Sequence, residues 1–226
     1  DALNSGRWGQ ASSDLEQARV AFQRAGDVIN MAQAGSNLAE IYIEVGRYEE
    51  AEQFLREARR VWRSSGFAMG VAAVNNGLGR ALARSGRSEE GAELLRDALH
   101  RFESLGHPPY AAESAARLAE ALVFGRDWSG AIEVLDALSD AAAIEAGPPV
   151  VALAMRMRGV ALARLGDVDG AREWLQRTRT TGDTQGVEWE SALASIELSR
   201  VGDTPAEEAA FLERSARAVL ESMGVD

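Results

Sequence analysis

The sequence predicts an all-α protein, a solenoid of stacked helix pairs with about eleven helices. Apolar residues recur with a helical period, as in the stripe of Leu38, Ile41 and Tyr42. Glycines follow such stripes in two interleaved series, each with a spacing of about 40 residues. No stretch alternates apolar and polar residues as a strand with one buried face would. Together these observations favour a repeat protein made only of helices.

The two glycine series predict where the helices end. The first comprises Gly6, Gly46, Gly86, Gly125, Gly166 and Gly202, and the second comprises Gly26, Gly66, Gly106, Gly147, Gly182 and Gly224. Glycine is favoured just past a helix end because it adopts left-handed backbone angles without a Cβ clash. Members of one series fall about halfway between members of the other, which indicates two helices in each repeat of about 40 residues.

The expected helices follow from these turns and from the apolar stripes between them. They span residues 7–25, 28–45, 47–65, 67–85, 87–105, 108–125, 127–146, 148–165, 167–181, 183–200 and 204–223. Two of them should begin at the proline pairs Pro108-Pro109 and Pro148-Pro149, since proline is tolerated in the first turn, where its missing N–H has no helical partner.

The repeats resemble the tetratricopeptide repeat. The segments "NLAEIYIEVGRYEEA" at 37–51 and "RLAEALVFGRDWSGA" at 117–131 share a Leu-Ala pair, a glycine turn, an aromatic residue and a following alanine. The spacing is near 40 residues instead of the common 34, most repeats lack the closing proline, and the last repeat is degenerate. The resemblance covers nearly the whole chain and implies a right-handed superhelix that binds proteins and has no catalytic activity.

We expect one solenoid over residues 1–226. Its repeats are predicted at approximately 1–26 (partial), 27–66, 67–106, 107–147, 148–182 and 183–226. Asp1 to Ser5 look like the last turn of a helix whose remainder is missing, so we expect a fragment of a larger protein. Long arrays of this kind resemble the C-terminal regions of bacterial signal-transduction ATPases, including transcription activators and cyclase-linked regulators.

Composition argues against several classes of partner. The 226 residues carry a net charge of −11 and a sequence pI near 4.8, which disfavours binding to nucleic acid and to anionic membranes. There is no cysteine and therefore no disulfide, which fits a reducing compartment, and we see no apolar segment long enough to cross a bilayer. We therefore expect a cytoplasmic protein.

No motif in the sequence predicts an enzyme, a metal site or a cofactor. His100 and His107 are the only histidines and have no nucleophile or ligand set near them in sequence. Gly77 and Gly79 do not match the dinucleotide-binding spacing, and they are more simply explained by close helix packing. The tryptophans are expected in the core.

The family resemblance implies a binding surface on the concave face, which the first helix of each repeat lines. Carried over to this chain, that face comprises Asn37, Glu40, Asn76, Arg80, Arg84, Arg117, Glu120 and Arg156. Arg80, Arg117 and Arg156 would form a basic strip suited to an acidic peptide or a carboxylate. The alternative is that these arginines pair with Glu40, Glu113 and Glu120 inside the groove.

The predicted function is a protein-interaction scaffold, the sensor or docking segment of a bacterial signalling or transcription-regulatory protein, which binds a peptide or protein in the groove. The alternative is self-association into a homodimer through the open ends of the array. A small-molecule sensor or an enzyme is less favoured, because no site signature supports either.

Overall fold

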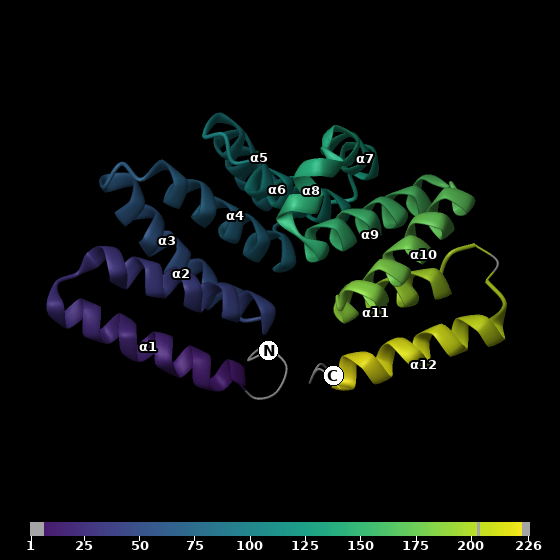
Figure 1. The fold of residues 1–226 in the computed structure, drawn as a ribbon, viewed down its shortest axis with the longest axis horizontal. Coiled ribbons are helices and arrows are strands. Elements are labelled where there is room, and N and C mark those ends of the chain that lie inside the picture. The colour runs from purple at the N-terminus through teal and green to yellow at the C-terminus, as the bar shows by residue number, and fades with distance from the viewer. Residues whose placement is uncertain (1–6, 203, 223–226) are drawn as a thin grey trace. The chain divides into compact units, whose positions relative to one another are not determined.

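The computed structural model describes residues 7–202 and 204–222, and within them it contains twelve α-helices and no strand. The chain divides into two compact units, residues 1–107 and 108–226. The helices of the first are α1 (Arg7–Ala25), α2 (Val28–Glu44), α3 (Tyr48–Ser64), α4 (Ala68–Arg84) and α5 (Ser88–Ser104). Those of the second are α6 (Pro108–Phe124), α7 (Trp128–Ala137), α8 (Asp140–Ala146), α9 (Pro148–Leu165), α10 (Val168–Gln185), α11 (Glu188–Ser199) and α12 (Ala206–Ser222). Within each unit, successive helices pack against one another, except that α8 packs against α6 and α9 instead of α7 (Figure 1).

Most of the predicted glycine turns are confirmed. Positive φ angles occur at Gly26, Gly46, Gly66, Gly86, Gly106, Gly147, Gly166 and Gly202. At Gly46, for example, φ is 77°, and the following Arg47 N–H donates to the Tyr42 carbonyl oxygen at 2.8 Å, which closes the end of α2. The two glycine series therefore located these helix ends correctly.

Two of the predicted turns were wrong. After α6 the left-handed residue is Arg126, with a φ of 63°, and not Gly125. Gly182 lies inside α10, which continues to Gln185 and ends at Gly186, whose φ is 72°. A Cβ on Gly182 would lie 2.7 Å from the Cβ of Ser191, so this glycine allows α10 and α11 to approach. The predictions for Gly6, Gly224 and the segment from Asp1 to Ser5 fall outside the described residues.

The predicted helix over 127–146 is two helices, which is why the structure has one helix more than expected. Leu138 and Ser139 have extended backbone angles, with ψ of 121° and 125°, so the helix stops after Ala137. The Ser139 hydroxyl then caps α8 by accepting from the Ala142 N–H at 3.5 Å. The apolar pattern alone did not reveal this break because serine in a helix is only mildly unfavourable.

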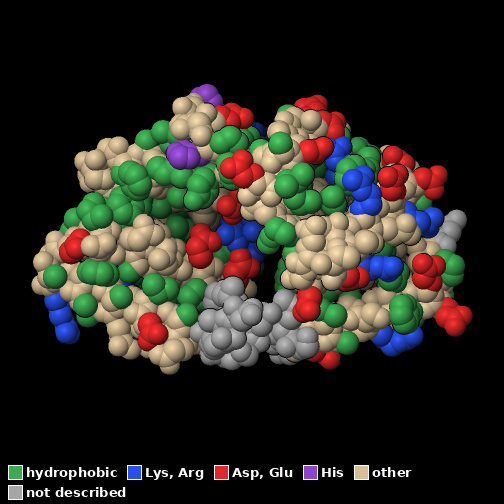
Figure 2. All heavy atoms as spheres, viewed as in Figure 1, with side chains coloured by type: hydrophobic (Ala, Val, Ile, Leu, Met, Phe, Trp, Pro, Cys, Tyr) green, Lys and Arg blue, Asp and Glu red, His purple; other side chains and the backbone are tan. Residues whose placement is uncertain are grey.

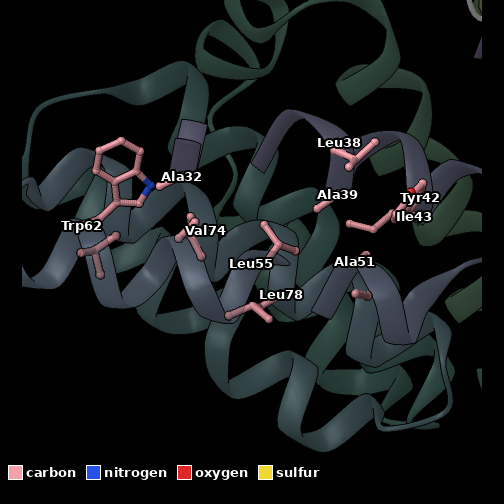
Figure 3. Close-up of a cluster of buried hydrophobic side chains, with 13 residues drawn as sticks. Ala32, Leu38, Ala39, Tyr42, Ile43, Ala51, Leu55, Trp62, Val74 and Leu78 are labelled. Carbon is pink, nitrogen blue, oxygen red and sulfur yellow. The ribbon is translucent and has the colours of Figure 1, made fainter. Parts of the chain in front are cut away.

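The core of the first unit joins three successive helices. Leu38 and Tyr42 of α2, Leu55 of α3, and Val74 and Leu78 of α4 are all buried in one apolar cluster (Figure 3). The stripe of each helix is thus covered by the next helices in the chain, as a repeat array requires. In the second unit Leu118, Leu153, Met157 and Leu175 are equally buried.

Glycines inside helices mark close backbone approaches. A Cβ on Gly79 would lie 2.8 Å from the Gly91 carbonyl oxygen and 2.5 Å from the Leu95 Cγ, so α4 and α5 touch through their glycines. This confirms the packing role expected for Gly79. Of the tryptophans whose side chains are described, Trp62 is buried, whereas Trp128, Trp174 and Trp189 are only half-buried.

Candidate functional site

The predicted site residues all lie on the helices that begin the helix pairs. In the first unit, Asn37 and Glu40 are on α2, and Asn76, Arg80 and Arg84 are on α4. In the second unit, Arg117 and Glu120 are on α6, and Arg156 is on α9. We call these residues, together with Glu44 on α2 and Glu190 on α11, the first-helix face of their unit.

In the first unit, arginines of α4 reach the carboxylates of α2. The Arg80 guanidinium donates through Nη1 to Glu40 Oε2 at 2.5 Å and through Nη2 to Glu44 Oε1. Arg84 Nη1 lies 3.5 Å from Glu44 Oε2. The Arg80 side chain is 5% exposed, whereas those of Glu40 and Glu44 are 49% and 41% exposed. The two carboxylates are therefore accessible to solvent, whereas the guanidinium that binds them is not.

The two amides of this unit differ in exposure. Asn37 is exposed, and its Oδ1 accepts from Gln33 Nε2 at 2.9 Å within α2. Asn76 is buried at 9% exposure. Only Asn37 of the two therefore presents its amide directly to solvent.

In the second unit, a buried ion pair joins α9 to α11. Arg156 Nε donates to Glu190 Oε2 at 2.5 Å, and each side chain is 9% exposed. Burial lowers the pKa of Arg156, but the charge and hydrogen bond of Glu190 outweigh it, with smaller contributions from Glu120 and Glu197, so that its pKa lies above the ordinary value. Arg117 Nη1 lies 3.4 Å from Glu120 Oε2 on α6. Arg156 is therefore a buried cation that is paired with the carboxylate of Glu190.

The pairing alternative is confirmed for two of the arginines, since Arg80 contacts Glu40 and Arg117 contacts Glu120. Arg156 pairs instead with Glu190, which the sequence analysis had not included. Glu44 was also missed, although it lies four residues after Glu40, on the same side of its helix. Arginine and acidic side chains are likewise interspersed on the face shown in Figure 2. Each of these three arginines therefore has a carboxylate partner within its own unit.

We also searched the described residues for a metal site and for a membrane-spanning helix. No group of three or more His, Cys, Asp or Glu side chains among residues 7–202 and 204–222 is arranged to hold a metal ion. None of the helices within those ranges combines the length and hydrophobicity needed to span a membrane.

Comparison with known families identifies the repeat. One tetratricopeptide repeat model matches residues 2–64 and 30–104, and a second matches residues 76–142 and 116–184. The chain belongs to the tetratricopeptide repeat family. A search of curated protein sequences found no match.

Solved structures share the fold at low sequence identity. A Rap protein complexed with Competence and Sporulation Factor superposes with a TM-score of 0.78 at 13% identity, covering 96% of this chain and 60% of that one. BtubC (BKLC) from P. vanneervenii gives 0.65 at 21% identity, covering 96% and 91%. Repeats of a Podosopora anserina putative kinesin light chain give 0.62 at 19%, covering 85% and 95%. These likenesses establish the all-α, tetratricopeptide-like solenoid fold. Solenoids of stacked repeats form extended concave surfaces to which other molecules bind.

Proposed function

We propose that this chain is a non-enzymatic docking segment of a bacterial signalling or regulatory protein, located in the cytoplasm, and that its first-helix face binds a peptide or protein. The observation that carries the proposal is the arrangement around Arg80. This buried guanidinium contacts both Glu40 and Glu44, whose carboxylates remain about half exposed. Because Arg80 already holds the two carboxylates in place, they lose little side-chain entropy when a partner binds them.

The exposures suggest what the partner must offer. An acidic peptide was expected from the arginines, but Arg80 is 5% exposed and its charge is already met by glutamates. A partner that meets the first unit through Glu40 and Glu44 would instead present N–H donors, either backbone amides or cationic side chains. We therefore propose that the segment bound here is not predominantly acidic.

The structural relatives support a docking role by analogy. The Rap protein is a structure of this fold in complex with Competence and Sporulation Factor, and the present chain spans 60% of it. By that analogy, we propose that the present array also binds a partner molecule.

The test places a bulky cation at the exposed amide beside the glutamates. Asn37→Arg should abolish capture of the partner, because the new side chain would compete for Glu40 and occupy the surface. The matched control is Gln53→Arg on α3, which is also an exposed amide, on a second helix of a pair. Both variants, with the wild type, serve as bait in a source lysate, and bound proteins are quantified by mass spectrometry.

A partner that is lost only with Asn37→Arg supports the proposal. A partner retained equally by both variants would place the interface elsewhere. If no protein is enriched, native mass spectrometry of the purified chain would show whether a small molecule occupies the face instead.

Self-association is a second candidate, favoured by one observation. Phe211, on the last helix α12, is 60% exposed, and an exposed aromatic side chain is typical of an interface. If two copies meet there, light scattering should give twice the monomer mass for the wild type and the monomer mass for Phe211→Ser.

A further inference from the structure

Three arginines lie close to one another in the first unit, on the second helices of two neighbouring pairs. Arg59 and Arg63 are four residues apart on α3, so they share one side of that helix. Arg101 is on α5, and α4 packs against both α3 and α5. The charges of Arg63, Arg101 and Asp97 all act on Arg59. We call Arg59, Arg63, Arg101 and Asp97 the arginine cluster.

The one carboxylate of the arginine cluster is already bound by two donors. Arg101 Nε donates to Asp97 Oδ2 at 2.7 Å, and Asn75 Nδ2 on α4 donates to the same oxygen. Asn75 is completely buried, so it fixes Asp97 against α4. Arg59 acts on Asp97 through its charge, without a hydrogen bond. The carboxylate is therefore held by α4 and α5, and α3 supplies none of its donors.

Arg59 has neither a hydrogen-bond acceptor nor an ion pair within residues 7–202 and 204–222. Its Nε is buried, and the residue as a whole is half-buried. Arg63 also lacks an ion pair in that part of the chain, although it is exposed. The nearby Arg56 differs, because it pairs with Glu52 at 2.5 Å. Arg59 is thus a cation partly withdrawn from water without a compensating acceptor, which is unfavourable.

The position of Arg59 in its helix does not account for this arrangement. Arg63 and Arg101 lie in the last turns of α3 and α5, where the helix dipole favours a cation, but Arg59 lies about one turn earlier. Burial lowers the pKa of Arg59, and the charge of Arg63 lowers it further. Arg56 and Arg101 act in the same direction, whereas Asp97 raises the pKa. The surroundings of Arg59 therefore favour an added anion.

The charge of the arginine cluster indicates which anion fits. Asp97 offsets one of its three arginines, which leaves the equivalent of two positive charges. A phosphate group carries about −1.5 to −2 charges at pH 7 and has three acceptor oxygens, whereas a carboxylate carries a single charge. Guanidinium groups bind phosphate oxygens through paired N–H bonds. The net charge of −11 disfavours a nucleic acid, so a single phosphate group fits better than a chain of them.

We propose that the arginine cluster is a second binding site, which binds one phosphate dianion through the guanidinium groups of Arg59, Arg63 and Arg101. Free phosphate and a phosphorylated side chain of a partner protein share this chemistry, and the experiment below distinguishes them. The site uses α3 and α5 and includes no residue of the first-helix face. It therefore does not depend on whether that face binds a partner.

The experiment uses synthetic peptides and the whole chain. Fluorescein-labelled glycine-rich peptides with phosphoserine, serine or glutamate at the centre are titrated with the protein at low salt and followed by anisotropy. We expect the phosphoserine peptide to bind at least about tenfold more tightly than the glutamate peptide, and the serine peptide not to bind. Inorganic phosphate is then added as a competitor. Displacement near the Kd of the peptide identifies free phosphate as a sufficient ligand, whereas a need for at least about tenfold more identifies the phosphorylated side chain.

Variants of the protein locate the site. Arg59→Gln should weaken binding by roughly tenfold or more, because it removes the cation that has no partner of its own. Arg63→Gln changes an exposed side chain, so its fold should be intact, and it should weaken binding by about threefold or more. The matched control is Arg60→Gln, which removes the same charge from an exposed position on another side of α3 and should change binding by less than about twofold. Circular dichroism checks the fold of each variant.

The proposal is overturned if the phosphoserine peptide does not bind at roughly 1 mM, because a weak contact should be visible at that concentration. It is also overturned if Arg63→Gln and Arg60→Gln have equal effects, since binding would then follow net charge alone. Equal binding of the glutamate and phosphoserine peptides would overturn the assignment to a dianion. Asn37 is intact in every one of these variants, so failure here is separate from failure of the first-helix docking site.

Discussion

Arg156→Met should destabilise the chain strongly, because it leaves a carboxylate buried without its cation. Arg156 and Glu190 are each 9% exposed and bonded at 2.5 Å, and Glu120 lies close enough to act on Arg156. Removing one member of a buried ion pair typically costs about 3–5 kcal/mol. Methionine fills most of the vacated volume, so the loss reflects charge more than packing. Glu120 retains Arg117 at 3.4 Å, so the cost falls mainly on Glu190.

The assay is urea unfolding of the wild type and variants, followed by circular dichroism and tryptophan fluorescence. Arg177→Met is the matched control, since its ion pair with Glu173 is exposed and should contribute no more than about 1 kcal/mol. The double variant Arg156→Met with Glu190→Met should recover most of the lost stability, because it leaves neither charge of the pair behind. The reasoning is refuted if Arg156→Met costs no more than Arg177→Met, or if the double variant is less stable than the single one.

Three further predictions follow from particular contacts. Gly91→Ala should cost about 1–3 kcal/mol in urea unfolding, because the new Cβ would lie 2.6 Å from the Gly79 carbonyl oxygen, whereas Gly9→Ala, with nothing within 4 Å, should be neutral or stabilising. Asp167→Ala should cost about 1 kcal/mol by removing the cap that accepts from the Gly170 N–H at 3.0 Å, and restoration by Asp167→Ser would verify the capping role. Burial raises the pKa of Asp97, but the hydrogen bond and charge of Arg101 outweigh it and hold the pKa below the ordinary value. The carboxylate of Asp97 therefore stabilises the fold above about pH 4, and the difference in urea midpoint between wild type and Asp97→Asn should shrink as the pH falls below that value.

The fold was predictable because its signals are local and repeated. The stripe of Leu38 and Tyr42 and the turn at Gly46 recur in similar form about every 40 residues, so each copy supports the assignment of the others. Where one copy departs from the pattern the prediction failed, as at Gly182, whose role depends on the Ser191 side chain of the next helix. The break after Ala137 was also not predicted, because Leu138 and Ser139 form it and neither is a glycine or a proline.

The candidate site was predictable only in part. The family pattern placed Arg80, Arg117 and Arg156 on the first helices, but it did not give their partners or their burial. Glu44 and Glu190 complete the ion pairs, and each lies more than thirty positions from its arginine in the chain. Trp174 was expected in the core, and it instead lines a pocket next to two arginines.

By itself, the sequence determined that this protein is a helical repeat array and where most of its helices end, because helix periodicity and glycine turns are properties of neighbouring residues. Only the tertiary structure decided which charges are neutralised, how exposed each one is, and where a pocket opens. Those properties depend on distances between side chains of different helices, and the pattern of a single helix carries no record of them.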